Sequence, residues 1–273
     1  MLEPVPLPGI DPMLLSPSPE CGPFGRDWKI NVEAGGRVFY QLQRLKIRNG
    51  IGPDLDFVDS LKFSRGLLLG EAYAALRLPP WFALTYTFRF PREDTGSGTL
   101  PASLRVSDTL FLPGDPILIK STSTAHRWEG EFFLPLGCHF RGGVYVLGDL
   151  LIERWDVDST VLINDVPTPV SVFKTYSEFY PGLGGTAEFA PTPVLFIKGK
   201  AAYLFSQENL GGVYLDGEVR FFPDFNKCDM MDPGPFRPYI GAGFRYKFLQ
   251  WIREDQKFEA QTFGPYGSIG FVF

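Results

Sequence analysis

Two histidines are the residues of this 273-residue chain best suited to acid–base chemistry. His126 lies in a stretch where apolar and polar residues alternate, and Ser121 and Ser123 occupy the opposite phase. On an extended strand those hydroxyls point to the other face, so no nucleophile–base pair forms within the strand. His139 stands at a turn. We therefore expect no catalytic residues and interpret His126 as a polar residue beside Trp128 at an interface.

Three aspartates, Asp54, Asp56 and Asp59, could in principle bind calcium. The segment lacks the glycine and the terminal glutamate of an EF-hand loop. We interpret these residues as solvated loop carboxylates and expect no metal site and no cofactor. The chain also has three cysteines without metal-ligand spacing, which are Cys21, Cys138 and Cys228.

The composition indicates many strands joined by turns, with 30 glycines, 25 prolines and 15% aromatic residues. The net charge of −5 gives no electrostatic basis for nucleic-acid binding. No run approaches the roughly 18 apolar residues that a membrane helix needs. A barrel wall carries its apolar residues alternately and has a weak hydropathy signal, so the average hydropathy does not exclude a membrane.

Period-two alternation predicts ten strands. The first, from Trp28 to Gln43, is far longer than the ~5–6 residues usual in globular sheets. The others are expected at about 68–78, 82–90, 116–134, 139–155, 176–189, 195–205, 215–221, 240–248 and 263–273. Long connections are expected at 44–65, 92–115, 156–175, 223–236 and 253–261, and tight proline-containing turns at 79–80, 135–138 and 190–193. Four of the five long connections thus lie at one end of the sheet, and the tight turns lie at the other.

Charged residues share one phase of the strands, and both signs are nearly balanced. The cations of this phase include Arg37, Arg77, Arg89, Arg127, Arg141, Arg220 and Arg245, and the carboxylates include Glu33, Glu71, Glu129, Glu131, Asp149, Glu188, Asp216 and Glu218. The opposite phase mixes aromatic residues with Gly and Ala, which would leave holes in a packed core but suit contact with lipid. A soluble barrel would have the reverse arrangement, with its charges outside. Alternation alone does not distinguish the two.

The chain ends F-G-P-Y-G-S-I-G-F-V-F, with Ile269, Phe271 and Phe273 on one face. This segment resembles the C-terminal strand of bacterial outer-membrane β-barrel proteins, in which a terminal aromatic serves as the assembly signal. The even strand number and the alternating connections extend the resemblance to nearly the whole chain, without a specific subfamily. It implies an all-β fold, a transmembrane antiparallel up-and-down β-barrel of about ten strands, with eight or twelve as alternatives.

The resemblance also implies a domain organisation. Residues 1–26, rich in proline, are expected to form a periplasmic leader, and residues 27–273 the outer-membrane barrel. We expect a mature chain from which an export signal has been removed. The strand order brings the cysteines to the periplasmic side, where Cys21 and Cys228 lie near the closing seam. Any disulfide should therefore join these two cysteines.

The expected function is that of a non-enzymatic integral barrel of the bacterial cell outer membrane, with a structural, anchoring or loop-mediated binding role. The alternatives are a narrow, porin-like solute channel and a lipid-modifying enzyme. Expected partners are outer-membrane lipid and lipopolysaccharide, the barrel assembly machinery, and a protein bound through the outer loops or the leader, but no nucleic acid. Because ten strands lie near the closed end of the barrel series, side chains should fill the lumen.

Overall fold

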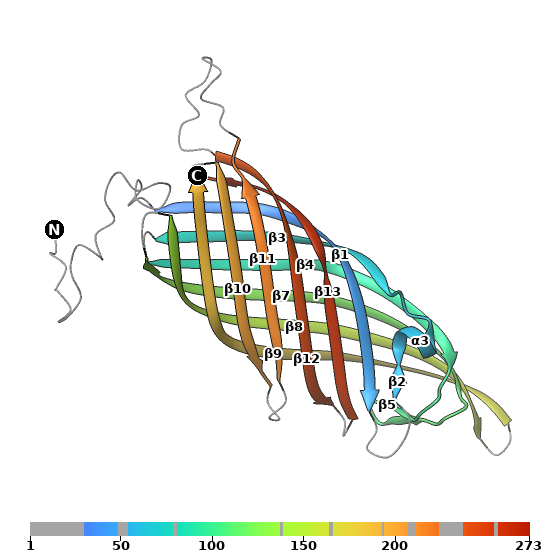
Figure 1. The fold of residues 1–273 in the computed structure, drawn as a ribbon. Coiled ribbons are helices and arrows are strands. Elements are labelled where there is room, and N and C mark those ends of the chain that lie inside the picture. The colour runs from blue at the N-terminus through green and yellow to red at the C-terminus, as the bar shows by residue number, and fades with distance from the viewer. Residues whose placement is uncertain are drawn as a thin grey trace.

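The computed structural model describes residues 30–48, 54–78, 81–136, 139–163, 166–192, 194–206, 211–223, 237–253 and 256–273. Ten long strands form one closed antiparallel barrel (Figure 1), which confirms the predicted fold class and strand number. The strands are β1 Asn31–Arg48, β3 Gly66–Leu78, β4 Phe82–Thr99, β7 Pro116–Pro135, β8 Phe140–Ile163, β9 Val166–Thr192, β10 Leu195–Phe205, β11 Gly211–Phe221, β12 Arg237–Arg253 and β13 Gln256–Val272.

The barrel closes where the last strand pairs with the first. β13 runs antiparallel to β1, with Arg37 opposite Ser268. Val32 and Phe273 exchange two backbone hydrogen bonds, of 3.3 and 2.8 Å. Closure leaves no edge along this seam, so backbone groups within a bilayer find their partners in the protein. We call the end of the barrel that holds this pair the terminal end.

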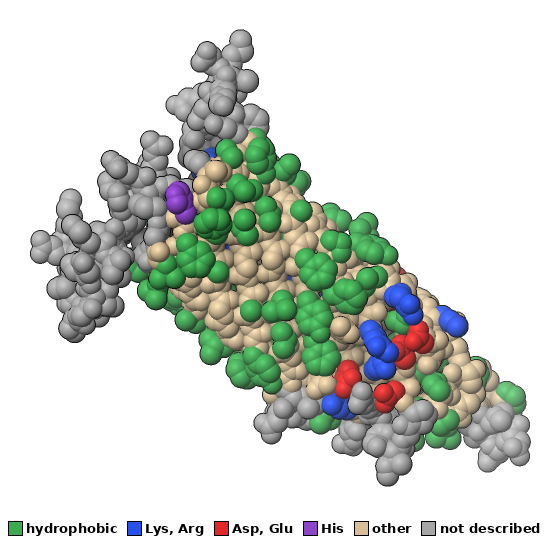
Figure 2. Space-filling view, in the orientation of Figure 1, with side chains coloured by type: hydrophobic (Ala, Val, Ile, Leu, Met, Phe, Trp, Pro, Cys, Tyr) green, Lys and Arg blue, Asp and Glu red, His purple; other side chains and the backbone are tan. Residues whose placement is uncertain are grey.

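Outward-facing side chains divide the barrel into two regions (Figure 2). Over the half nearer the terminal end, large apolar side chains are exposed, and we call this half the apolar band. Its outward residues include Val32, Val38, Tyr40, Leu68, Leu84, Tyr86, Trp128, Phe132, Val144, Val146, Leu183, Phe189, Ile197, Val213, Val219, Ile240, Phe244, Ile269 and Phe271. The remainder, which we call the collar, comprises residues 43–48, 92–99, 116–125, 152–163, 166–178, 249–253 and 256–261 of the long strands and the short elements beside them.

The short elements all belong to the collar. β2, Leu55–Asp56, pairs with β1, and α3, Phe57–Leu61, follows it directly. β5, Leu104–Val106, and β6, Thr109–Phe111, form a separate two-stranded sheet. Within the described residues, no helix is long and apolar enough to cross a membrane.

The inner and outer faces exchange chemical character within single strands. In the band part of β8, Val144 and Val146 face outward while Asp149 faces inward. In its collar part, Trp155 is buried inside and Arg154 is exposed outside. The backbone phase is unchanged, but apolar residues have moved to the inner face.

This exchange explains three of four wrong predictions. The segments 92–99, 156–163, 166–175 and 256–261, expected within connections, are parts of β4, β8, β9 and β13. In the last three segments the inward residues are apolar, in the phase opposite to that of the apolar residues of the band, so the alternation appears to end at each transition. The first segment, 92–99, has no large apolar side chain and therefore resembles a polar connection. In β4 a register shift between Arg89 and Arg92 adds a bulge at the same level. The predicted connection 44–65 is likewise wrong in part, because β1 continues to Arg48 and residues 55–61 form β2 and α3.

Segment 54–64 closes a gap in the collar wall. β3 begins only at Gly66, so beyond it β1 and β4 have no strand between them. The end of α3 and the residues after it pack there against β4 so closely that a Cβ on Gly96 would lie 2.0 Å from the Phe63 ring and 2.5 Å from the Leu61 carbonyl oxygen. Ser64 N donates to Asp94 Oδ1 of β4, over 3.3 Å. Glycine at position 96 therefore allows the segment to seal the wall.

Candidate functional site

The interior of the apolar band contains a network of buried ion pairs, which we call the lumen network. Nearest the terminal end, Glu33 accepts hydrogen bonds from Arg220 at 2.7 Å, from Tyr239 at 2.8 Å and from Arg77 at 3.3 Å. Glu188 interacts with Arg77, with Lys198 and with Arg141. A charge buried without a partner is strongly unfavourable, so carboxylates shared among several cations indicate a tightly constrained interior.

A second layer of the network lies further along the barrel axis. Asp216 accepts from Arg245 and from Tyr266, both at 2.7 Å, and from Tyr214 at 2.8 Å. Arg245 also donates to Glu71 over 2.8 Å. The remaining contacts of the network include Arg37–Glu218 at 3.4 Å, Arg220–Glu218 at 2.8 Å, Arg127–Asp149 at 3.3 Å, Lys200–Glu129 at 2.7 Å, Lys198–Glu131 at 2.7 Å and Lys247–Asp149.

Aromatic rings complete the surroundings of the arginines. The guanidinium carbon of Arg37 lies 4.4 Å from the Tyr73 ring centroid, and that of Arg245 lies 4.3 Å from the Phe39 centroid. Such contacts contribute more where water is excluded. Tyr214, Tyr239 and Tyr266 were not among the predicted network residues. Tyr214 and Tyr239 do stand in the same period-two phase as the charged residues of their strands, whereas the strand of Tyr266 has no charged residue between 263 and 273 that could mark this phase.

The structure places every residue of the predicted charge set inside the barrel, but they do not form one uniform cluster. Arg89 stands apart. No described carboxylate lies within 4.0 Å of its guanidinium, and its Nε atom is buried without a hydrogen-bond partner. Lys198, Lys200 and Lys247, from the same phase of β10 and β12, provide further cations.

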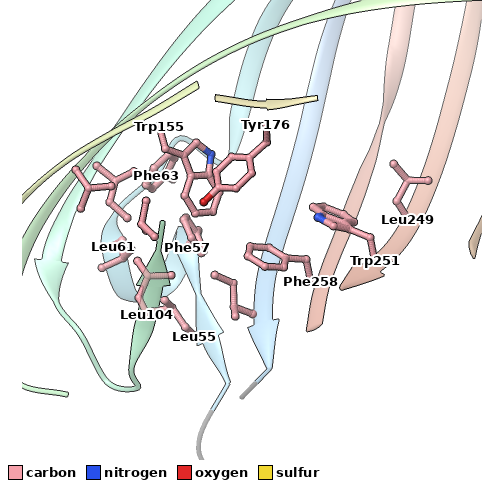
Figure 3. Close-up of a cluster of buried hydrophobic side chains, with 14 of the residues drawn as sticks. Leu55, Phe57, Leu61, Phe63, Leu104, Trp155, Tyr176, Leu249, Trp251 and Phe258 are labelled. Atoms are coloured by element: carbon pink, nitrogen blue, oxygen red, sulfur yellow. The ribbon is translucent and has the colours of Figure 1, made fainter. Parts of the chain in front are cut away.

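The interior of the collar is an apolar core (Figure 3). Trp155 packs against Phe57 of α3 and Phe258 of β13, with ring centroids 5.5 and 5.9 Å apart. Phe258 stacks on Trp251 at 5.4 Å. Leu55, Leu61 and Leu104 from the short elements are fully buried in the same core. The interior of the collar is therefore packed with apolar side chains, as the core of a soluble domain is.

The three aspartates of segment 54–64 have separate structural environments. The interpretation of Asp56 as a solvated loop residue was wrong, because it is buried and caps α3: its carboxylate accepts hydrogen bonds from the Val58 and Asp59 amides. Asp59 pairs at the surface with Arg65 over 3.0 Å. Asp54 is exposed.

The two histidines lie at different levels of the outer wall. His126 Nδ1 is 2.8 Å from the Tyr86 hydroxyl, in a cluster that includes Trp128, 6.2 Å away between ring centroids. His139 Nδ1 lies 3.0 Å from the Ala190 carbonyl oxygen. Cys21, Cys138 and Cys228, like the leader 1–26, lie outside the described residues, so the disulfide remains a prediction.

The terminal aromatic residues point away from the barrel. Ile269, Phe271 and Phe273 are 62%, 40% and 49% exposed, on the outer face of the apolar band. Their backbone is fixed between β1 and β12, so the side chains present a ridge toward the surrounding medium.

Comparison with solved structures agrees with this geometry. The outer membrane protease OmpT from Escherichia coli has a TM-score of 0.52 and 8% identity, over 89% of this chain and 97% of that chain. This is an outer-membrane type of β-barrel fold. At this identity the likeness shows the architecture of the barrel and leaves its activity open.

Two further structures resemble the barrel more weakly. The attachment invasion locus protein Ail of Yersinia pestis has a TM-score of 0.34 and 8% identity, over 88% of this chain and 98% of that chain. The translocator domain of the autotransporter NalP from Neisseria meningitidis has a TM-score of 0.36 and 9% identity, over 88% and 89%. No protein-family model matches the sequence, and no curated protein matches it.

Proposed function

We propose that this protein is a non-enzymatic integral β-barrel of a bacterial outer membrane, closed to solutes, with a structural, anchoring or binding role. The observation that carries the proposal is the filling of the interior at both levels. Ion pairs occupy the lumen of the apolar band, and an apolar core occupies the collar. Solute passage would require both to open, and separating buried charges is costly.

The proposed position of the barrel in the membrane follows from the outer surfaces of the apolar band and of the collar. The apolar band would lie in the bilayer, because water is a poor solvent for a continuous apolar surface of this extent. The collar would project beyond the membrane and present its outer surface to lipopolysaccharide or to a protein partner. Ile269, Phe271 and Phe273 would serve as the signal for the barrel assembly machinery.

Planar-bilayer recording tests the closed lumen. Purified full-length protein should insert without stable conductance steps. A matched variant, Glu71→Ala, removes a carboxylate that binds Arg245 and should increase transient leak, whereas Asp108→Ala, in an exposed turn, should not. Stable stepwise conductance from the unmodified protein would reject the proposal in favour of the narrow channel.

The channel is the second candidate because one cavity remains between the lumen network and the collar core. For the lipid-modifying enzyme, the relevant residue is His126. Its described hydrogen bond is to the Tyr86 hydroxyl, not to a serine or a carboxylate. A changed mass of lipid A on expression, abolished by His126→Ala, would favour the enzyme.

A further inference from the structure

A cavity of about 100 Å³ separates the lumen network from the collar core. Its two walls differ in character. Arg89, Arg92 and Lys247 lie on the network side, while Leu151, Leu249 and Trp251 belong to or pack against the apolar core. The cavity is therefore basic on one side and apolar on the other.

The cations of this cavity are unequally neutralised. Lys247 pairs with Asp149, and Arg44 donates to Asp56 over 3.2 Å. Arg92 donates to the neutral Oε1 atom of Gln43. Arg89 has no described ion pair, and its charge repels that of Arg92.

The nearby carboxylates are already bound to other groups. Glu71 pairs with Arg245, and Asp149 with Arg127 and Lys247. Glu153 lines the cavity and accepts from the Ser121 hydroxyl at 3.1 Å. Asp94 also lies near Arg92 and accepts a hydrogen bond from Gln43 Nε2 at 2.7 Å. No described carboxylate forms an ion pair with Arg89, and its buried Nε atom has no hydrogen-bond partner beside the cavity.

We infer that this cavity binds a small organic monoanion, with its carboxylate at Arg89 and Arg92 and its apolar part against Leu249 and Trp251. A guanidinium forms paired, charge-assisted hydrogen bonds with a carboxylate. The carboxylate of the anion would therefore supply the negatively charged hydrogen-bond acceptor that Arg89 lacks. An inorganic anion would satisfy the charge but leave the apolar wall unused. The inference concerns a site within a closed barrel and does not depend on the proposed role of the protein.

Calorimetry with the full-length protein in detergent tests the inference, with benzoate as the probe. Benzoate should bind with 1:1 stoichiometry, and benzamide, of similar shape but neutral, about tenfold or more weakly. Arg89→Gln and Arg92→Gln should each weaken benzoate binding by a similar factor. Arg89→Lys should retain part of the affinity, because it keeps the charge without the planar fork.

The matched control is Arg154→Gln, since Arg154 is exposed on the outer wall and pairs with Asp156. It should leave the benzoate affinity unchanged, and each variant is checked for a folded, heat-modifiable band on gels. Equal binding of benzamide and benzoate would overturn the inference, as would an unchanged affinity in Arg89→Gln and Arg92→Gln. If chloride at equal concentration displaced benzoate, the site would take inorganic anions and the apolar half of the inference would be wrong.

Discussion

The apolar band and the collar are built from the same strands and are filled in opposite ways. In the band part of β8, apolar Val146 faces outward and Asp149 faces inward, whereas in the collar Arg154 faces outward and Trp155 inward. The collar wall also retains some large exposed apolar residues, among them Leu118, Val166, Phe173 and Ile252. The comparison teaches that the medium outside the barrel wall, lipid or water, decides whether the outer or the inner face is apolar. A single strand can therefore be apolar on its outer face in one part and on its inner face in another.

The two regions also differ in how their interiors are stabilised. In the collar, burying a large apolar side chain contributes about 1.5–3 kcal/mol, as in a soluble protein. In the band, the apolar side chains face outward, and the polar and charged side chains that alternate with them fill the lumen. Those charges are tolerable only when each has partners, so the loss of one residue has consequences for several others.

The largest effect is expected for Glu188→Gln in the lumen network. Glu188 is fully buried and is shared by Arg77, Arg141 and Lys198. The substitution keeps the shape but removes the negative charge, and breaking a buried pair costs about 3–5 kcal/mol. Urea unfolding in detergent, followed by gel mobility, measures the change.

The control for Glu188→Gln is Lys120→Gln, which removes an exposed pair with Glu93 and should cost about 0–1 kcal/mol. Equal effects of the two substitutions would mean that the network is hydrated like a surface, contrary to the account.

A smaller, local effect is expected for Leu61→Ala in the collar core. Leu61 is fully buried, and removing it should cost about 2–5 kcal/mol at that site. The band should remain folded, because its strands do not depend on α3. Limited proteolysis should therefore cut segment 54–65 while the barrel core persists. Leu110→Ala, at an exposed position of β6, should leave the digestion pattern unchanged. Complete loss of the barrel would show that the two regions are not separable.

The smallest effect is expected for Asp56→Ala at the start of α3. Its carboxylate accepts from two backbone amides, and losing such a cap costs about 0.5–2 kcal/mol. Faster amide exchange at Val58 and Asp59 is the measurement. Asp108→Ala, in an exposed turn, is the matched control and should leave that exchange unaltered. Unaltered exchange in Asp56→Ala itself would show that packing against Gly96, not the cap, holds the helix.

Much of the band could be predicted from the sequence, because along each of its strands apolar residues facing outward alternate with polar residues facing inward. Residues such as Arg37 and Asp216 alternate with apolar neighbours, and a period of two assigns them to one face. The strand number, the seam and the inward charges follow from it. The pairing partners do not: Glu33 and Arg220 lie 187 positions apart, and no local pattern indicates that they meet.

The collar could not be predicted in the same way, because there the apolar residues face inward and the polar residues face outward. In Trp155-Asp156-Val157-Asp158 the alternation is intact, but the apolar residues stand in the other phase. Long connections are polar on average, so this segment was interpreted as a loop. The wall-sealing segment had a readable signal, since Leu55, Phe57 and Leu61 are apolar residues in a polar stretch and Asp56 stands at a capping position.

Spin-label accessibility in lipid bilayers tests the central claim most directly. Labels replace Val146 and Arg154 of β8, in a chain whose cysteines are changed to serine. Both positions face outward, and eight residues at about 3.4 Å each separate them by roughly 27 Å. The account predicts that the Val146 label is accessible to oxygen and shielded from an aqueous nickel chelate, and that the Arg154 label shows the reverse. Equal exposure of both labels to the chelate would contradict it.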